Sequence, residues 1–249
     1  MDPSLWLVAL GAAAAGFVQG LSGFGFALVA MSFWAWGLEP SVAAVLAVFG
    51  GLTGQVFAAL TMRRGFDARR LLPFVVGGLC GIPLGLWLLP RFDPHMFRAF
   101  VGGLLVVWCP SMLLARHIPR ITAGGRVADA VAGALGGVMG PLGGATGAMP
   151  TLWCTLRGFE KDAQRAIIQN FNLAMLAVTM AVQLSIGLVT RDMLPLFAIV
   201  APALLLPAML GTRVYVGISE AAFRSVVLGL LTASGVALLA GSVPRLLRQ

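Results

Sequence analysis

Long apolar runs dominate the chain, and short polar segments separate them. Six of these runs, three in each half, have the length of a helix that crosses the hydrocarbon core of a bilayer, about 20 residues. They are residues 41–61, 71–90, 97–115, 166–188, 193–211 and 222–241. The pattern therefore predicts six transmembrane helices.

Two further apolar runs differ from the six because glycines interrupt them. Residues 5–37 as one helix would measure about 50 Å, too long for a hydrocarbon core of about 30 Å and short for two full crossings. Residues 127–156 form a similar run in the second half. A broken-helix hairpin fits each run best, with turns predicted at residues 21–26 and 140–144.

The two interrupted runs share a glycine pattern. The glycines that correspond are Gly16, Gly20 and Gly23 in the first run and Gly133, Gly137 and Gly140 in the second. A second matching phrase follows each run, at residues 37–43 and 158–163. Apolar segments interrupted by glycine or proline in corresponding positions of two halves are the best sequence indication of a transporter's binding site.

These patterns predict an all-α, polytopic membrane protein with one integral membrane domain. It consists of two repeats, residues 1–120 and 121–249, each a broken-helix (re-entrant) hairpin followed by three transmembrane helices. If each hairpin enters and leaves on one side, the repeats are inverted. That arrangement places more of the 17 basic residues on the cytoplasmic side than single crossings do. The positive-inside rule therefore favours inverted repeats.

The composition agrees with a membrane protein. The chain of 249 residues is 59% hydrophobic and 10% charged, with a mean hydropathy of +0.94, whereas soluble domains carry about 25% charged residues. The net charge of +8 comes from basic residues between apolar runs. No basic stripe with interleaved aromatic residues occurs, so nucleic acid is excluded as a partner.

The breaks predict a binding site for a small anion in the middle of the bilayer. A half-helix that begins at a break directs unpaired N–H groups and a positive dipole end into the protein, and such ends favour anions. No Asp or Glu lies near the centre of a span, which argues against a carboxylate cation site. The candidate substrate-binding residues are Gln19, Gly20, Ser22, Gly23, Gly25, Gln55, Gly140, Gly143, Gly144, Thr146, Gln169, Asn170 and Asn172.

The duplicated Gly-x3-Gly-x2-Gly phrase, with the turn that follows each copy, resembles the sulfite exporter TauE/SafE family of bacterial membrane proteins. The resemblance covers nearly the whole chain. It implies transport of sulfite, of sulfonates such as sulfoacetate, or of related organic acids across the inner membrane. The chain departs from the family's usual Gly-x-Gly-Gly-Gly run at residues 23–27 and 143–145. Phe24 and Phe26 suit a larger or partly apolar anion.

The sequence therefore predicts a multi-pass secondary transporter, an exporter, of a small sulfur-containing or organic oxyanion, with no metal or other cofactor. An inside-negative potential drives each negative charge outward by about 2.3 kcal/mol per 100 mV, so uniport suffices, and coupling to H⁺ or Na⁺ is an open alternative. An anion channel on the same scaffold and a non-transporting membrane partner of another protein are further alternatives. An enzyme is not expected, because no His-Glu-x-x-His or Gly-x-Ser-x-Gly motif occurs.

Overall fold

The computed structural model describes residues 3–22, 25–61, 65–115, 119–121, 123–214 and 220–246, and these residues form helices and no strands. The first half contains α1 (Pro3–Ser22), α2 (Phe26–Trp34), α3 (Pro40–Thr61), α4 (Ala68–Leu88) and α5 (Pro94–Leu114). The second half contains α6 (Gly125–Gly143), α7 (Ala148–Leu156), α8 (Lys161–Ser185), α9 (Leu194–Val214) and α10 (Glu220–Leu246). Short 3₁₀ helices, Leu89–Arg91 and Arg191–Met193, precede α5 and α9.

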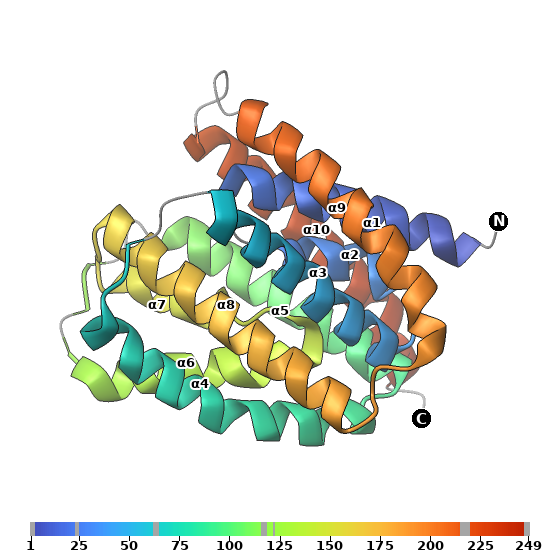
Figure 1. Cartoon of the computed structure of the whole chain (residues 1–249), viewed down its shortest axis with the longest axis horizontal. Helices are drawn as coiled ribbons and strands as arrows, with labels where there is room; N and C mark the ends of the chain where they lie inside the picture. The colour runs from blue at the N-terminus through green and yellow to red at the C-terminus, as the bar shows by residue number, and fades with distance from the viewer. Residues whose placement is uncertain are drawn as a thin grey trace.

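Six helices among the described residues are long and apolar enough to cross a membrane: α3, α4, α5, α8, α9 and α10. The six predicted transmembrane runs fall on these helices. The ten α-helices of the described residues pack into one bundle, in which α3 and α8 lie side by side (Figure 1). The prediction of a helical, multi-pass membrane protein is confirmed.

Each interrupted run folds as a long helix followed, after a break, by a helix of nine residues. In the first run α2 follows α1, and Gly25 before α2 has a left-handed backbone, φ 95°. In the second run α7 follows α6, which ends at Gly144 with φ 70°. Glycine adopts these angles without the steric cost that a Cβ atom brings. Gly144 therefore ends α6, and Gly25 allows the chain to turn into α2.

The second break lies slightly later than the predicted turn at residues 140–144. Helix α6 continues to Gly143, and the break occupies the residues before Ala148. Pro141 does not stop the helix, because the Gly144 N–H still donates to the Gly140 carbonyl, at 2.7 Å, and closes the last turn. The left-handed Gly144 ends the helix instead.

The first hairpin begins and ends at the same end of the molecule. The Trp34 indole N–H, at the end of α2, donates to the Val8 carbonyl near the start of α1, at 3.3 Å. A Cβ atom added at Gly11 would lie 2.9 Å from Cδ1 of Trp34. Helix α2 therefore returns along α1 as the second arm of the hairpin.

Glycines bring α6 against α4 and α1 against α9. On the first pair, a Cβ atom at Gly81 would overlap the Ala134 carbonyl, and one at Gly137 would overlap the Gly78 carbonyl. On the second pair, Gly20 lies in the same way against the Ala208 carbonyl. Backbones that approach this closely are typical of helix packing in membranes. Most of the duplicated glycines are therefore packing residues.

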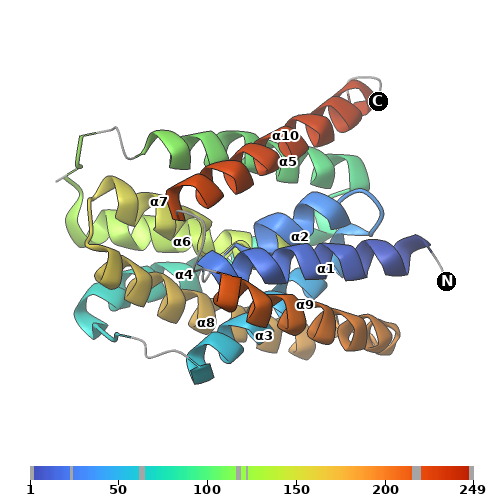
Figure 2. The same ribbon diagram turned by 90° about the horizontal axis from the view of Figure 1, so that it is seen from above.

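The contacts between helices follow one pattern in both halves. The long hairpin helix of one half packs on a helix of the other half, α6 on α4 and α1 on α9. Helices in the same chain order within each half pack on each other, α3 on α8 and α5 on α10. Figures 1 and 2 both show α1 beside α9. Helices α3 and α8 run in opposite directions, because Gly51 contacts Leu176 while Gly65, beyond the end of α3, accepts from Asn170.

We expect Gly81→Ala to lower the free energy of unfolding by about 1–3 kcal/mol, because the added methyl group meets backbone that cannot move aside. Gly103→Ala, where nothing lies within 4 Å of the added atom, is the matched control. It should be neutral or stabilising by up to about 1 kcal/mol, the helix propensity gained. Thermal unfolding in detergent micelles measures both variants, and equal midpoints would contradict the close contact.

Candidate functional site

The two breaks meet at one buried cavity. Its volume is about 30 Å³, enough for roughly two water molecules. Both hairpins contribute backbone, and α1, α3 and α8 contribute side chains. The lining residues are Gln19, Gly25, Phe26, Ala27, Leu28, Gly51, Gln55, Gly144, Ala145, Thr146, Gly147, Ala148, Asn172 and Leu176.

The cavity lies at the middle of the two central helices. Gly51 and Gln55 are in the central turns of α3, and Asn172 and Leu176 are in those of α8. Gln55 is 2% exposed. The breaks therefore reach the interior of the bundle and not its ends.

Gln19 projects from the last part of α1 into this cavity. Its side chain is 5% exposed, and Oε1 has no hydrogen-bond partner among the described residues. A Cβ atom at Gly54 of α3 would overlap the Gln19 amide, so a glycine makes the space that the amide occupies. A buried acceptor oxygen without a partner is costly, so this position requires a hydrogen-bond donor such as a water molecule.

Asn172 holds a comparable position on the opposite side. The Thr146 hydroxyl donates to Asn172 Oδ1 at 2.8 Å, and both residues are buried. This bond occupies the amide oxygen, so the group that Asn172 can offer to a ligand is its NH₂. A Cβ atom at Gly147 would lie 2.6 Å from Asn172 Oδ1. Each half therefore places one buried amide beside a glycine.

Two helix N-termini also face the cavity. Gly25 precedes α2 and Gly147 precedes α7, and neither helix has a side-chain hydrogen bond at its N-cap. The first-turn residues Phe26, Ala27 and Leu28 line the cavity, as does Ala148. First-turn N–H groups have no intrahelical acceptor, and the positive end of the helix dipole lies beside them. In α7 the Ala148 N–H donates to the Ala145 carbonyl at 3.1 Å, so this helix end acts mainly through its dipole. With no acidic residue in its lining, the cavity suits an anion.

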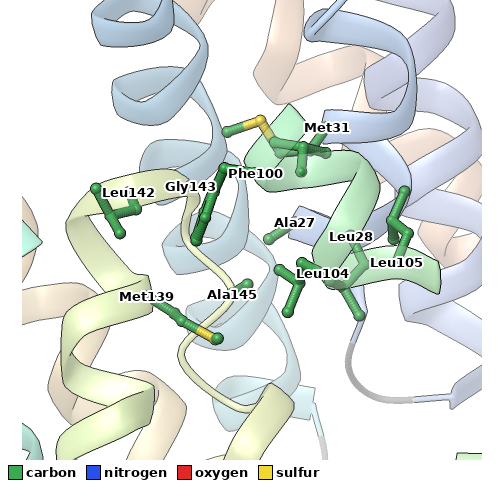
Figure 3. A pocket seen from close by; sticks show the side chains of 11 residues that line it. Ala27, Leu28, Met31, Phe100, Leu104, Leu105, Met139, Leu142, Gly143 and Ala145 are labelled. Atoms are coloured by element: carbon green, nitrogen blue, oxygen red, sulfur yellow. The ribbon is translucent and has the colours of Figure 1, made fainter. Parts of the chain in front are cut away.

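The remaining wall of the cavity is apolar. Figure 3 shows an adjoining pocket where Met31 of α2, Phe100 and Leu104 of α5, and Leu142 of α6 come together. Its volume is only about 10 Å³, so side chains fill this space. Ala27, Leu28 and Ala145 line both spaces. The hydrogen-bonding groups therefore lie on one side of the site.

Several predicted residues lie near the cavity without lining it. A Cβ atom at Gly140 would lie 3.1 Å from Thr146 Cγ2, so Gly140 packs against the second break. Gly143 faces Met31 on the apolar side, and Gly20 packs on α9. Gln169 is buried on α8, about one turn before Asn172.

Three other predicted residues are not placed at the cavity. The Asn170 amide donates to the carbonyls of Gly65, at 2.9 Å, and Ala166, at 2.8 Å, and so points away from it. Gly23 lies outside the described residues, as does the side chain of Ser22. The substrate-binding role of the predicted set as a whole stays a prediction.

The structure adds residues that the sequence did not single out. Gly54 and Gly147 make space for the two amides; no local signal marks them, because their importance depends on the facing element. Thr179 and Gln183 are fully buried on α8, and their side-chain polar atoms have no partner among the described residues. Their spacing from Asn172 places them on its face of the helix, a periodicity that the sequence does contain.

The fold and the site together define a class of protein. Six apolar helices and paired broken helices that meet in the interior are the architecture of multi-pass membrane transporters. Within this class, the chain belongs to the sulfite exporter TauE/SafE family, whose model matches residues 8–238. The match includes both breaks, and the resemblance noted in the sequence is confirmed. Comparisons with curated proteins and with solved structures gave no match.

Proposed function

We propose that the protein is a secondary transporter that exports a small sulfur-containing or organic oxyanion, sulfite or a sulfonate such as sulfoacetate, across the bacterial inner membrane. The observation that carries the proposal is the convergence of one helix N-terminus from each half on a cavity that three buried amides line, with no carboxylate in its lining. The amides are Gln19 and Gln55 from the first half and Asn172 from the second. Family membership supports the substrate class.

The cavity size supports a small substrate. A cavity with room for roughly two water molecules suits a pyramidal inorganic oxyanion better than a two-carbon sulfonate. Phe26 and Leu28 at the edge of the cavity supply the apolar contact that the organic part of a sulfonate needs. Sulfite therefore fits the observed conformation more closely, and sulfoacetate requires the hairpin tips to separate.

We further propose that the halves are inverted repeats and that both hairpins are re-entrant. The opposite directions of α3 and α8 support this relation. The packing of α1 on α9 and of α6 on α4 supports it as well, because α9 holds the place in the second half that α4 holds in the first. In such transporters one repeat moves against the other around a fixed site. Access to the cavity would then alternate between the two membrane faces.

The membrane potential can drive export without a coupling ion, because it moves each negative charge outward with about 2.3 kcal/mol per 100 mV. We expect proteoliposomes containing the protein to take up sulfite with saturable kinetics and to respond to an imposed potential. Sulfoacetate should compete with sulfite, and zwitterionic taurine should not. Protein-free liposomes are the control.

Each other outcome of this flux measurement supports a different function for the protein. Flux that never saturates indicates a channel. Flux that requires a pH or sodium gradient replaces uniport with coupled transport. No flux of any anion in the panel, from protein that remains folded, overturns the proposal.

A further inference from the structure

An open basin lies at the end of the molecule where α4 and α6 begin and α7 ends, at the left in Figure 1. Its volume is about 530 Å³. Four arginines line it, against two acidic residues. They are Arg69 and Arg70 of α4, Arg126 of α6, and Arg157, with Asp129 and Glu160 as the acidic residues. The basin therefore carries an excess of positive charge.

Arg157 neutralises the buried acidic residue of the basin. Its Nη1 lies 2.8 Å from Asp129 Oδ1, and the Trp153 indole N–H donates to the same oxygen at 2.8 Å. Asp129 is 7% exposed. The charges of Arg69 and Arg126 are consequently not offset by Asp129. Arg70 pairs with Asp67 at 3.3 Å, but both side chains are about half exposed, and such pairs are weak.

An apolar groove of about 390 Å³ runs between α6 and α7 from the same end of the molecule. Val127, Val131 and Leu135 form its α6 side, and Leu152 and Leu156 form its α7 side. The three α6 residues are 76%, 54% and 48% exposed. From Gly124 to Leu135 the groove measures about 16 Å along the helix, close to half of the hydrocarbon core, about 15 Å.

The groove and the basin adjoin at the start of α6. Gly124 and Leu156 form the end of the groove, and the residues that follow them, Gly125 and Arg157, are joined because Arg157 Nη1 donates to the Gly125 carbonyl at 3.2 Å. This bridge is the boundary between the charged space and the apolar one. A molecule with an anionic head and an apolar tail can extend across it and occupy both.

We propose that this end of the protein binds an anionic phospholipid, with its phosphate in the arginine basin and one acyl chain in the groove between α6 and α7. Arginine pairs with phosphate through two parallel hydrogen bonds, and basic pockets beside membrane helices hold anionic head groups. The bound lipid would contact α6 and α7, the second hairpin, from outside the central cavity.

Native mass spectrometry of the whole protein in detergent, titrated with phosphatidylglycerol or with phosphatidylcholine, tests the proposal. Phosphatidylglycerol should bind at least about tenfold more tightly than phosphatidylcholine, as expected for several head-group arginines. The combined variant Arg69→Gln, Arg70→Gln and Arg126→Gln should lose this preference. Arg191→Gln, an exposed arginine beyond the opposite end of α8, is the matched control and should keep it.

A second arm separates a lipid from a soluble phosphate compound, with glycerol 3-phosphate as the probe. Val131→Trp fills the exposed groove and should weaken phosphatidylglycerol binding by at least about tenfold, as expected when a buried chain loses its contact area. It should leave glycerol 3-phosphate binding unchanged. The proposal is overturned if the arginine variant keeps its preference, or if Val131→Trp binds phosphatidylglycerol as the unmodified protein does. Thermal unfolding confirms that each variant is folded.

Discussion

Replacing Asn172 with leucine is expected to lower sulfite flux through the reconstituted protein by about 10- to 100-fold, the cost of losing a hydrogen bond to a charged group. The substitution removes the NH₂ donor from the cavity and leaves the Thr146 hydroxyl without its acceptor, Asn172 Oδ1. Initial rates of sulfite uptake into proteoliposomes, over a range of sulfite concentrations, measure the effect. Sulfite binding to the detergent-purified protein should weaken in parallel.

Asn170→Leu is the matched control for this variant. Asn170 is two residues away on the same helix, but its amide donates to the carbonyls of Gly65 and Ala166 outside the cavity. We expect its flux to stay within about twofold of the unmodified protein, as for substitutions away from special features. An equal loss in both variants would mean that α8 as a whole, and not the cavity, limits transport.

Gly144→Ala is expected to destabilise the protein by about 2–5 kcal/mol and to abolish flux. Gly144 has a φ of 70°, where a Cβ atom costs roughly 1–2 kcal/mol. That atom would also lie 2.9 Å from the backbone of Ala47 on α3, and such overpacking costs about 1–3 kcal/mol more. Thermal unfolding in micelles measures the stability, and sulfite uptake measures the function.

Gly187→Ala separates the two contributions. Gly187 has nearly the same backbone angle, φ 73°, but nothing lies within 4 Å of an added Cβ atom. It should therefore show only the conformational cost, about 1–2 kcal/mol, with transport retained. If Gly144→Ala is no less stable than Gly187→Ala, the second break does not press against α3 as described.

The sequence was sufficient to predict the helical spans and the presence of two breaks. Both follow from local physics: an apolar run of about 20 residues must form a helix in lipid to satisfy its backbone, and glycine clusters interrupt such runs. It also named a set of candidate amides, because amides within apolar runs need partners in the interior. Gln19 and Asn172 of that set line the cavity, and their substrate-binding role stays a prediction.

Neighbouring candidates show where this reasoning stops. Asn170 and Asn172 are equally polar and lie in the same span, yet only Asn172 lines the cavity. Successive helix residues point about 100° apart, so the rotation of α8 decides which of them faces the cavity. That rotation depends on contacts such as Gly51 with Leu176, which join residues far apart in the chain.

The amino-acid sequence alone determined that this is a helical membrane protein with two glycine-interrupted runs, because chain length in lipid and glycine geometry are local properties. Tertiary structure alone decided that duplicated glycines such as Gly20 and Gly137 pack helices together. It also decided that Gly54 and Gly147 make room for the two amides, and that an arginine basin adjoins an apolar groove. These features depend on which helix faces which, and no single segment of the chain contains that information.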